Sequence, residues 1–111
     1  MNTPPSTPRR RRLAKDASDV PAHDLSLFKA ARLRISGAAE DGAAAMDMTP
    51  TDICEALAQL APAHFFESMA AEKNPGVRMD VYHLPYHGRT IYVKFVRDPN
   101  GTFALTSFKE K

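Results

Sequence analysis

Apolar and polar residues alternate along the last third of the chain, which is the pattern of strands that bury one face. In residues 90–97, one face carries Ile91, Val93 and Phe95, and the other carries Tyr92, Lys94 and Val96. Residues 78–84 and 102–109 have a similar character. The sequences between them are Pro85-Tyr86-His87-Gly88 and Asp98-Pro99-Asn100-Gly101. Because these residue types favour turns, this part of the chain predicts an antiparallel meander.

The first half of the chain has the spacing of helices instead. We expect the helical part to cover residues 23–61. One helix follows the capping residue Asp24, a short one covers Ala38–Ala45, and another begins at Thr49-Pro50, with Pro at its first helical position. Helices that precede strands in this way predict an α+β fold, in which the helices pack on one face of a small antiparallel sheet.

The two predicted hairpins decide which side chains share a face of the sheet. If they close at Leu84–Arg89 and Arg97–Thr102, the opposite pairs are Tyr82 with Ile91, His83 with Thr90, Phe95 with Ala104 and Lys94 with Leu105. The apolar face then packs on the helices. The other face gathers four polar side chains, which are His83, Tyr92, Lys94 and Lys109. A shift of one residue at either turn would break up this group.

The N-terminal residues have a different composition. Residues 1–22 contain four prolines and the basic run Arg9–Arg12, with few apolar side chains. Such a segment buries too little surface to offset its ordering entropy, so we expect a disordered tail followed by a single domain over residues 23–111. The four arginines are typical of a solvated tail, and they also fit a segment that neutralises phosphates.

Length and composition exclude several classes of protein. The 111 residues, 43% of them hydrophobic and 25% charged, suit one soluble globular domain. The chain has no run of about 18 apolar residues that could span a membrane, and its Arg-rich start lacks the apolar region of a secretory signal. A single cysteine, Cys54, excludes an internal disulfide framework and a Cys-rich zinc module. We therefore expect a cytoplasmic protein.

Charge is distributed unevenly along the chain. Residues 73–111 hold seven basic and three acidic side chains, whereas residues 21–72 hold three basic and eight acidic ones. This asymmetry suggests one surface that meets polyanions and a second surface that does not.

Lysine, tyrosine and histidine on one open sheet face suit phosphate chemistry. Cleavage of RNA without a metal needs a base for the 2′-hydroxyl, cations at the phosphate and an acid for the leaving oxygen. A polar face that is simply covered by water is the alternative. His83 and His87 lack partners at metal-ligand spacing, so we expect no metal site. No phosphate-binding loop or nucleophile elbow occurs, and no cofactor is expected.

Several segments in order resemble one protein family. They are His23–Lys29, Phe65-Phe66-Glu67-Ser68-Met69, Asp80-Val81-Tyr82-His83, Tyr92-Val93-Lys94-Phe95 and the terminal Ser107-Phe108-Lys109-Glu110-Lys111. Together they resemble the MqsR family, the motility quorum-sensing regulator toxins of bacterial type II toxin–antitoxin systems. The resemblance covers about residues 23–111.

The resemblance implies a fold and an activity. Members have the fold of RelE-like ribonuclease toxins, a small antiparallel sheet with helices on one face. They cleave messenger RNA (mRNA) without the ribosome and are silenced by a cognate antitoxin. The resemblance therefore implies a metal-independent mRNA endonuclease whose partners are mRNA and an antitoxin protein, with no membrane and no small-molecule cofactor.

The resemblance also implies site residues. Family activity is ascribed to a lysine, a glutamine and a tyrosine, and these positions are Glu67, Met79 and Tyr92 here. The catalytic candidates are Tyr92, Glu67, Lys109 and His83, and the substrate-binding candidates are Lys94, Arg89, Lys111 and His87. Two accounts of the departures are open. Either Glu67 acts as the general base, or the chain is a weakened or inactive relative that binds RNA or antitoxin as a regulator.

Overall fold

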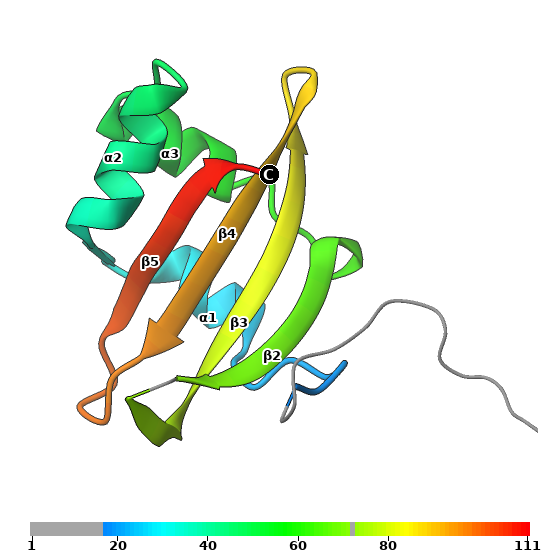
Figure 1. The fold of residues 1–111 in the computed structure, drawn as a ribbon, viewed down its shortest axis with the longest axis vertical. Helices are drawn as coiled ribbons and strands as arrows, with labels where there is room; N and C mark the ends of the chain where they lie inside the picture. The colour runs from blue at the N-terminus through cyan, green and yellow to red at the C-terminus, as the bar shows by residue number, and fades with distance from the viewer. Residues whose placement is uncertain (1–16, 72) are drawn as a thin grey trace, which may run out of the picture.

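A computed structural model describes residues 17–71 and 73–111. Its elements, in chain order, are α1 (Leu25–Ala30), β1 (Arg34–Ile35), α2 (Gly37–Ala45), α3 (Pro50–Leu57), the short 3₁₀ helix η1 (Pro62–His64), β2 (Phe65–Ala71), β3 (Asn74–Tyr86), β4 (Arg89–Arg97) and β5 (Phe103–Glu110). The five strands form one sheet in the order β1-β5-β4-β3-β2. Figure 1 shows this sheet with α1 behind it. The predicted α+β class is confirmed.

Side-chain caps begin the three α-helices. The Asp24 carboxylate accepts hydrogen bonds from the backbone N–H groups of Ser26 and Leu27, as predicted for α1. The Thr49 hydroxyl and the Asp52 carboxylate form a reciprocal capping box at the start of α3. Each cap satisfies backbone donors that have no partner inside the helix, which determines where the helix starts.

Strand β1 was not predicted, because its two residues lie within the segment expected to be helical. It pairs in parallel with β5, with Arg34 beside Ala104, and the Ser36 N–H donates to the Leu105 carbonyl over 3.0 Å. The sheet is therefore mixed at this edge, where β1 adds a parallel strand to the predicted antiparallel meander of β2 to β5. Two residues are too short to show the alternation that marks a strand.

The first hairpin closes two residues later than predicted. Its last pair is Tyr86 with Arg89, and the loop is His87–Gly88, both of which have positive φ angles, 49° and 82°. A two-residue loop of this kind matches the twist of the flanking strands. His83 therefore lies opposite Tyr92 instead of Thr90. Because the shift is two residues, each side chain stays on its predicted face.

The second hairpin was predicted in the wrong register. It closes with Arg97 opposite Phe103, and the register shifts between Lys94 and Phe95 because Thr106 is an extra residue on β5. Leu105 consequently lies opposite Phe95 and is fully buried, although it was expected on the polar face. Beyond this bulge, the pairs are Lys94 with Ser107 and Tyr92 with Lys109.

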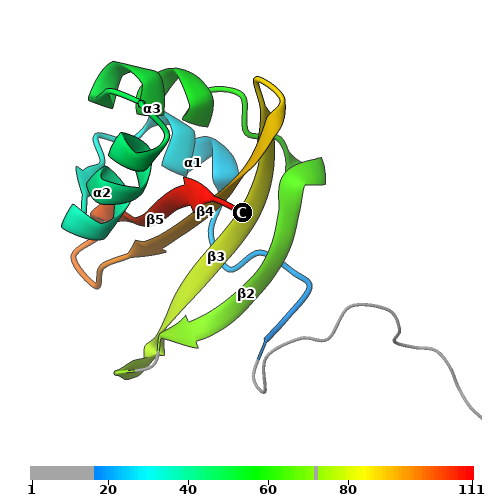
Figure 2. The same ribbon diagram turned by 45° about the horizontal axis from the view of Figure 1, so that its top comes forward.

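The core lies between the helices and one face of the sheet, and Figure 2 shows the three helices together on that side. Phe28 of α1 stacks on Phe95 of β4 with ring centroids 3.7 Å apart. Helix α2 lies directly against β5, since a Cβ atom at Gly42 would overlap the carbonyl oxygen of Phe108. Within residues 17–71 and 73–111, no helix covers the opposite face of the sheet.

Part of the predicted tail contacts the sheet. Ser18 and Ser68 exchange two backbone hydrogen bonds of 2.7 and 2.8 Å. The backbone N–H groups of Ala22 and His23 donate to the fully buried carboxylate of Asp80 over 3.1 and 2.9 Å. The folded part therefore begins before residue 23. The first sixteen residues of the predicted tail lie outside the described residues.

Candidate functional site

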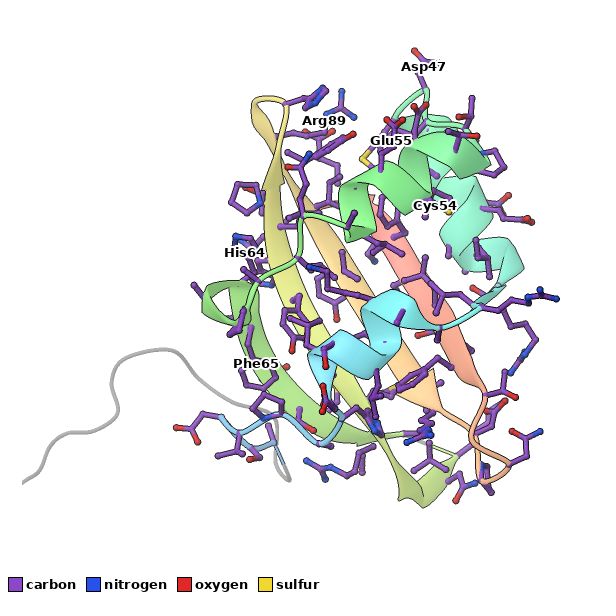
Figure 3. The ribbon with its side chains drawn as sticks, turned by 180° about the vertical axis from the view of Figure 1, so that it is seen from behind. Asp47, Cys54, Glu55, His64, Phe65 and Arg89 are labelled. Atoms are coloured by element: carbon purple, nitrogen blue, oxygen red, sulfur yellow. The ribbon has the colours of Figure 1, made fainter. Side chains whose placement is uncertain are left out.

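The face of the sheet that turns away from α1 carries two rows of side chains, each crossing the strands. This face is toward the viewer in Figure 1, and Figure 3 shows the opposite side, with α1 in front of the strands. The first row contains Phe66 of β2, His83 of β3, Tyr92 of β4 and Lys109 of β5. The second row contains Glu67, Val81, Lys94 and Ser107.

The first row is held together by ring contacts. The rings of Phe66 and His83 are stacked at 4.2 Å between centroids, and His83 and Tyr92 are 5.9 Å apart. The ammonium of Lys109 lies 5.4 Å from the centroid of the Tyr92 ring, a distance that gives a cation–π attraction. Tyr92 is thus packed between a histidine and a cation.

A bulge in β2 brings Phe66 and Glu67 to the same face. The pairing with β3 shifts between Phe65 and Glu67, so Glu67 lies opposite Val81 while Phe66 stacks on His83. Consecutive residues of a regular strand point to opposite faces, and the bulge removes this alternation. The carboxyl group of Glu67 therefore lies beside the aromatic row.

Glu67 is unusual for its burial. Only 8% of this residue is exposed, and its Oε1 atom has no hydrogen-bond partner among residues 17–71 and 73–111. A buried carboxylate oxygen without a partner is costly, unless a ligand supplies a donor. Such an atom is a candidate acceptor for a substrate hydroxyl or amino group.

The environment of Tyr92 keeps its phenol protonated. Burial raises the pKa of Tyr92, and the negative charge of Glu67 raises it further. A phenol with a raised pKa holds its proton at neutral pH and is a weaker acid than an ordinary tyrosine.

The structure does not bring all the candidate residues together. Arg89 and His87 lie at the β3–β4 hairpin and line a pocket of about 250 Å³ on the helix side of the sheet. Its acidic lining residues are Asp47, Asp52 and Glu55, and Figure 3 shows Arg89, Asp47 and Glu55 on that side. Lys111 ends the chain, where its backbone N–H donates to the Thr90 carbonyl over 2.8 Å.

Met79 and Phe66 are two further residues of the open face. Met79, at the family's glutamine position, lies between Met69 of β2 and Val96 of β4. Phe66 was not predicted as a site residue from the sequence. The sequence feature that could have identified Phe66 is its position next to Glu67. That position was not sufficient, because only the bulge in β2 puts both residues on one face.

Two classes of feature are not found within residues 17–71 and 73–111. No group of three or more His, Cys, Asp or Glu side chains there is arranged to hold a metal ion. None of the helices in these ranges is long and apolar enough to cross a membrane.

The comparison with protein families identifies the chain. The model of the family described as motility quorum-sensing regulator, toxin of MqsA, matches residues 20–110. The chain belongs to the MqsR toxin family. No curated protein sequence matches the chain.

Membership in the MqsR toxin family gives the site a context. The family consists of toxins of toxin–antitoxin pairs, so an antitoxin partner is implied. The matched range includes every strand that contributes to the open face. It begins at Val20, which lies between the two contacts that attach the N-terminal segment to the sheet, at Ser18 and at Ala22.

Proposed function

We propose that this MqsR-family toxin is an endoribonuclease that cleaves mRNA in the cytoplasm and is neutralised by a cognate antitoxin. The observation that carries the proposal is the set of four side chains on the open face, which are Glu67, Tyr92, Lys94 and Lys109. They supply an acceptor for a proton, a donor of a proton and two cations. These are the groups that RNA cleavage through the 2′-hydroxyl requires.

In the proposed reaction, Glu67 removes the proton of the 2′-hydroxyl, and the 2′-oxygen attacks the adjacent phosphorus. The bond from phosphorus to the 5′-oxygen breaks, and Tyr92 donates its proton to that leaving oxygen. The products are a 2′,3′-cyclic phosphate and a 5′-hydroxyl. Lys94 and Lys109 stabilise the negative charge that builds up on the phosphate oxygens.

The pKa of Tyr92 ensures that the phenol is protonated, but a raised pKa also makes it a weaker acid, so its position on the open face is what supports the role. A general acid must be protonated before the reaction, and burial beside Glu67 raises the pKa of this phenol above its ordinary value. The same neighbour that can accept a proton therefore helps to keep the donor protonated.

A second candidate function is a non-cleaving relative that binds RNA or antitoxin. It is favoured by the carboxylate of Glu67, which stands where family activity is ascribed to a lysine. A carboxylate repels phosphate, and removal of a cation takes away a favourable contact. The two candidates differ in whether Glu67 improves or impairs cleavage.

The deciding experiment is inducible expression in a bacterium, with and without the neighbouring reading frame, while new RNA 5′ ends are mapped. Growth arrest with discrete new 5′-hydroxyl ends, relieved by the neighbouring product, is the expected result. Glu67→Gln should lower cleavage about a hundredfold, which is the usual scale for loss of a general base. If Glu67→Lys instead creates cleavage that the parent lacks, the parent is a non-cleaving relative.

A further inference from the structure

The aromatic row on the open face contains two rings, Phe66 and His83, to which the proposed cleavage reaction assigns no role. Phe66 has no group that can transfer a proton, yet its ring is stacked on His83 with the planes only 21° apart. Both side chains are partly exposed, and they stand beside Tyr92 in the same row. The stack therefore presents aromatic surface next to the groups assigned to catalysis.

Stacked aromatic rings beside cations are how proteins hold unpaired nucleic-acid bases. Each base has a π-face that stacks on aromatic side chains, while lysines nearby contact the phosphate backbone. Here the rings of Phe66 and His83 lie at one end of the row, and the ammonium of Lys109 lies at the other end, over Tyr92. One nucleotide can thus place its base and its phosphate along a single row.

We propose that the Phe66–His83 stack binds an unpaired RNA base next to the cleaved phosphate. This inference rests on the proposed function and deepens it, because it makes single-stranded RNA the substrate class. A base inside a duplex is covered by its neighbours and cannot stack on the protein. His83 is then a binding residue, whose ring is held by Phe66, instead of a group that transfers a proton.

Glu67 provides a second observation that points to a ligand at this place. It follows Phe66 directly, is nine-tenths buried, and keeps Oε1 without a hydrogen-bond partner among the described residues. A nucleotide seated on the stack brings hydroxyl and amino donors close to this oxygen. Binding would therefore satisfy an acceptor that the described part of the chain leaves unpaired.

Charge favours RNA as the occupant of this face over an acidic protein or a membrane. Lys94 and Lys109 lie on the open face, and the acidic residues Asp47, Asp52 and Glu55 lie around the pocket on the helix side. A polyanion is attracted to the first surface and repelled by the second. Single-stranded RNA combines negative charge with exposed bases, which an acidic protein or a membrane does not.

The test uses the full chain and a short RNA that contains a mapped cleavage site. A 2′-O-methyl group on the nucleotide that supplies the nucleophile prevents cleavage and allows binding to be measured. Phe66→Leu and His83→Leu keep apolar bulk but remove the rings. Each should weaken binding about tenfold or more, because stacking on an aromatic ring contributes strongly to the binding of each base. Tyr86→Leu is the matched control, since Tyr86 stacks on His87 at 4.1 Å outside the row.

An abasic site beside the cleaved phosphate separates stacking from a general loss of affinity. The parent should bind the abasic RNA as weakly as the variants bind intact RNA, and the variants should lose little more with the abasic RNA. If the variants bind both RNAs as the parent does while the parent still cleaves, the inference is wrong and the proposed function stands. If the parent neither cleaves nor binds RNA, both are wrong.

A fluorescence measurement on the parent keeps the inference testable if a variant fails to fold. RNA that carries 2-aminopurine beside the cleaved phosphate loses fluorescence when that base stacks. A clear decrease on binding to the parent supports the stacking site. Unchanged fluorescence in a bound complex overturns it.

Discussion

The most specific role proposed for a single group is that of the Tyr92 hydroxyl as the proton donor. Tyr92→Phe removes only this hydroxyl and leaves the ring between His83 and Lys109. If the hydroxyl is the proton donor, cleavage should fall on the order of a hundredfold or more. RNA binding and the melting temperature should hardly change. Cleavage of a labelled RNA by the two purified proteins measures the difference.

The direction of the Tyr92 pKa gives the same role a pH signature. Because burial and Glu67 raise this pKa, the acid stays protonated as the pH rises past the ordinary tyrosine value of about 10. The alkaline decline of kcat/KM that this phenol causes should therefore lie above that value, and this part of the decline should be absent from Tyr92→Phe. Tyr86→Phe, outside the row, is the control, and equal cleavage by Tyr92→Phe and the parent would remove the acid role.

The raised pKa of Tyr82 predicts how the stability of the protein depends on pH. Burial, followed by the charges of Asp80 and Asp24, raises the pKa of Tyr82 to about 12. In the unfolded chain this phenol loses its proton near pH 10, so its contribution to stability is complete below that pH. The contribution is lost as the pH rises through the window from 10 to 12. Over this window, the free energy of unfolding measured with urea should fall more for the parent than for Tyr82→Phe. Equal decreases in the two proteins would contradict the raised pKa.

At the scale of elements, the strand faces could be predicted because the alternation of side chains has a period of two. The first hairpin closes two residues later than expected, and this error left every side chain on its predicted face. The bulge at Thr106 could not be predicted, since no Gly or Pro marks it. The burial of Leu105 was missed for another reason: the hairpin closes with Phe103, not Thr102, opposite Arg97, and this shift of one residue moves Leu105 to the buried face.

Two changes near the contact between the N-terminal segment and the sheet should have different effects on stability. A chain that begins at Ala17 keeps the bonds between Ser18 and Ser68, so its melting temperature should stay within about 2 °C of the full chain. Asp80→Asn replaces one acceptor for Ala22 and His23 with a donor, inside the protein. This loss should cost about 1–3 kcal/mol and lower the melting temperature by several degrees. Thermal unfolding of the three proteins measures both effects, and a large decrease for the shortened chain would show that residues 1–16 stabilise the fold.

The close packing of α2 on β5 makes Gly42 sensitive to substitution. A methyl group at this position would overlap the carbonyl oxygen of Phe108, so α2 must move away from the sheet. Gly42→Ala should therefore destabilise the protein by about 1–3 kcal/mol, the usual cost of overpacking. Gly37→Ala is the matched control, because a Cβ atom there meets nothing within 4 Å. Denaturant unfolding compares the two, and equal stabilities would show that α2 can shift freely.

For the whole molecule, the two faces of the sheet explain which parts of the site could be predicted. Alternation along β4 was enough to place Tyr92 and Lys94 on one face, whereas Lys109 joins them because the bulge at Thr106 offsets the one-residue error in the predicted hairpin register. Arg89 was named as a phosphate-binding candidate beside them, although its spacing from Ile91 already assigns it to the helix side. Glu67 came only from the resemblance, because the bulge that turns it to the open face depends on how β2 pairs with β3.

The separation of charge between the faces leads to a prediction about RNA binding. Asp52→Lys and Glu55→Lys change the acidic pocket beside the β3–β4 hairpin, on the helix side of the sheet and not on the face of the proposed RNA path. They should leave the affinity for the uncleavable RNA unchanged or raise it, because they replace repulsion with attraction. Asp52→Lys also removes the capping box of α3, so thermal unfolding first confirms that this variant is folded. Lys94→Ala and Lys109→Ala should each weaken binding and reduce the slope of log K against log salt by about 0.7, as expected when one phosphate of a single strand is no longer neutralised. Titrations at several salt concentrations measure both quantities. A tenfold loss of affinity in the Asp52→Lys or Glu55→Lys protein, about 1.4 kcal/mol, would place RNA on the helix side instead.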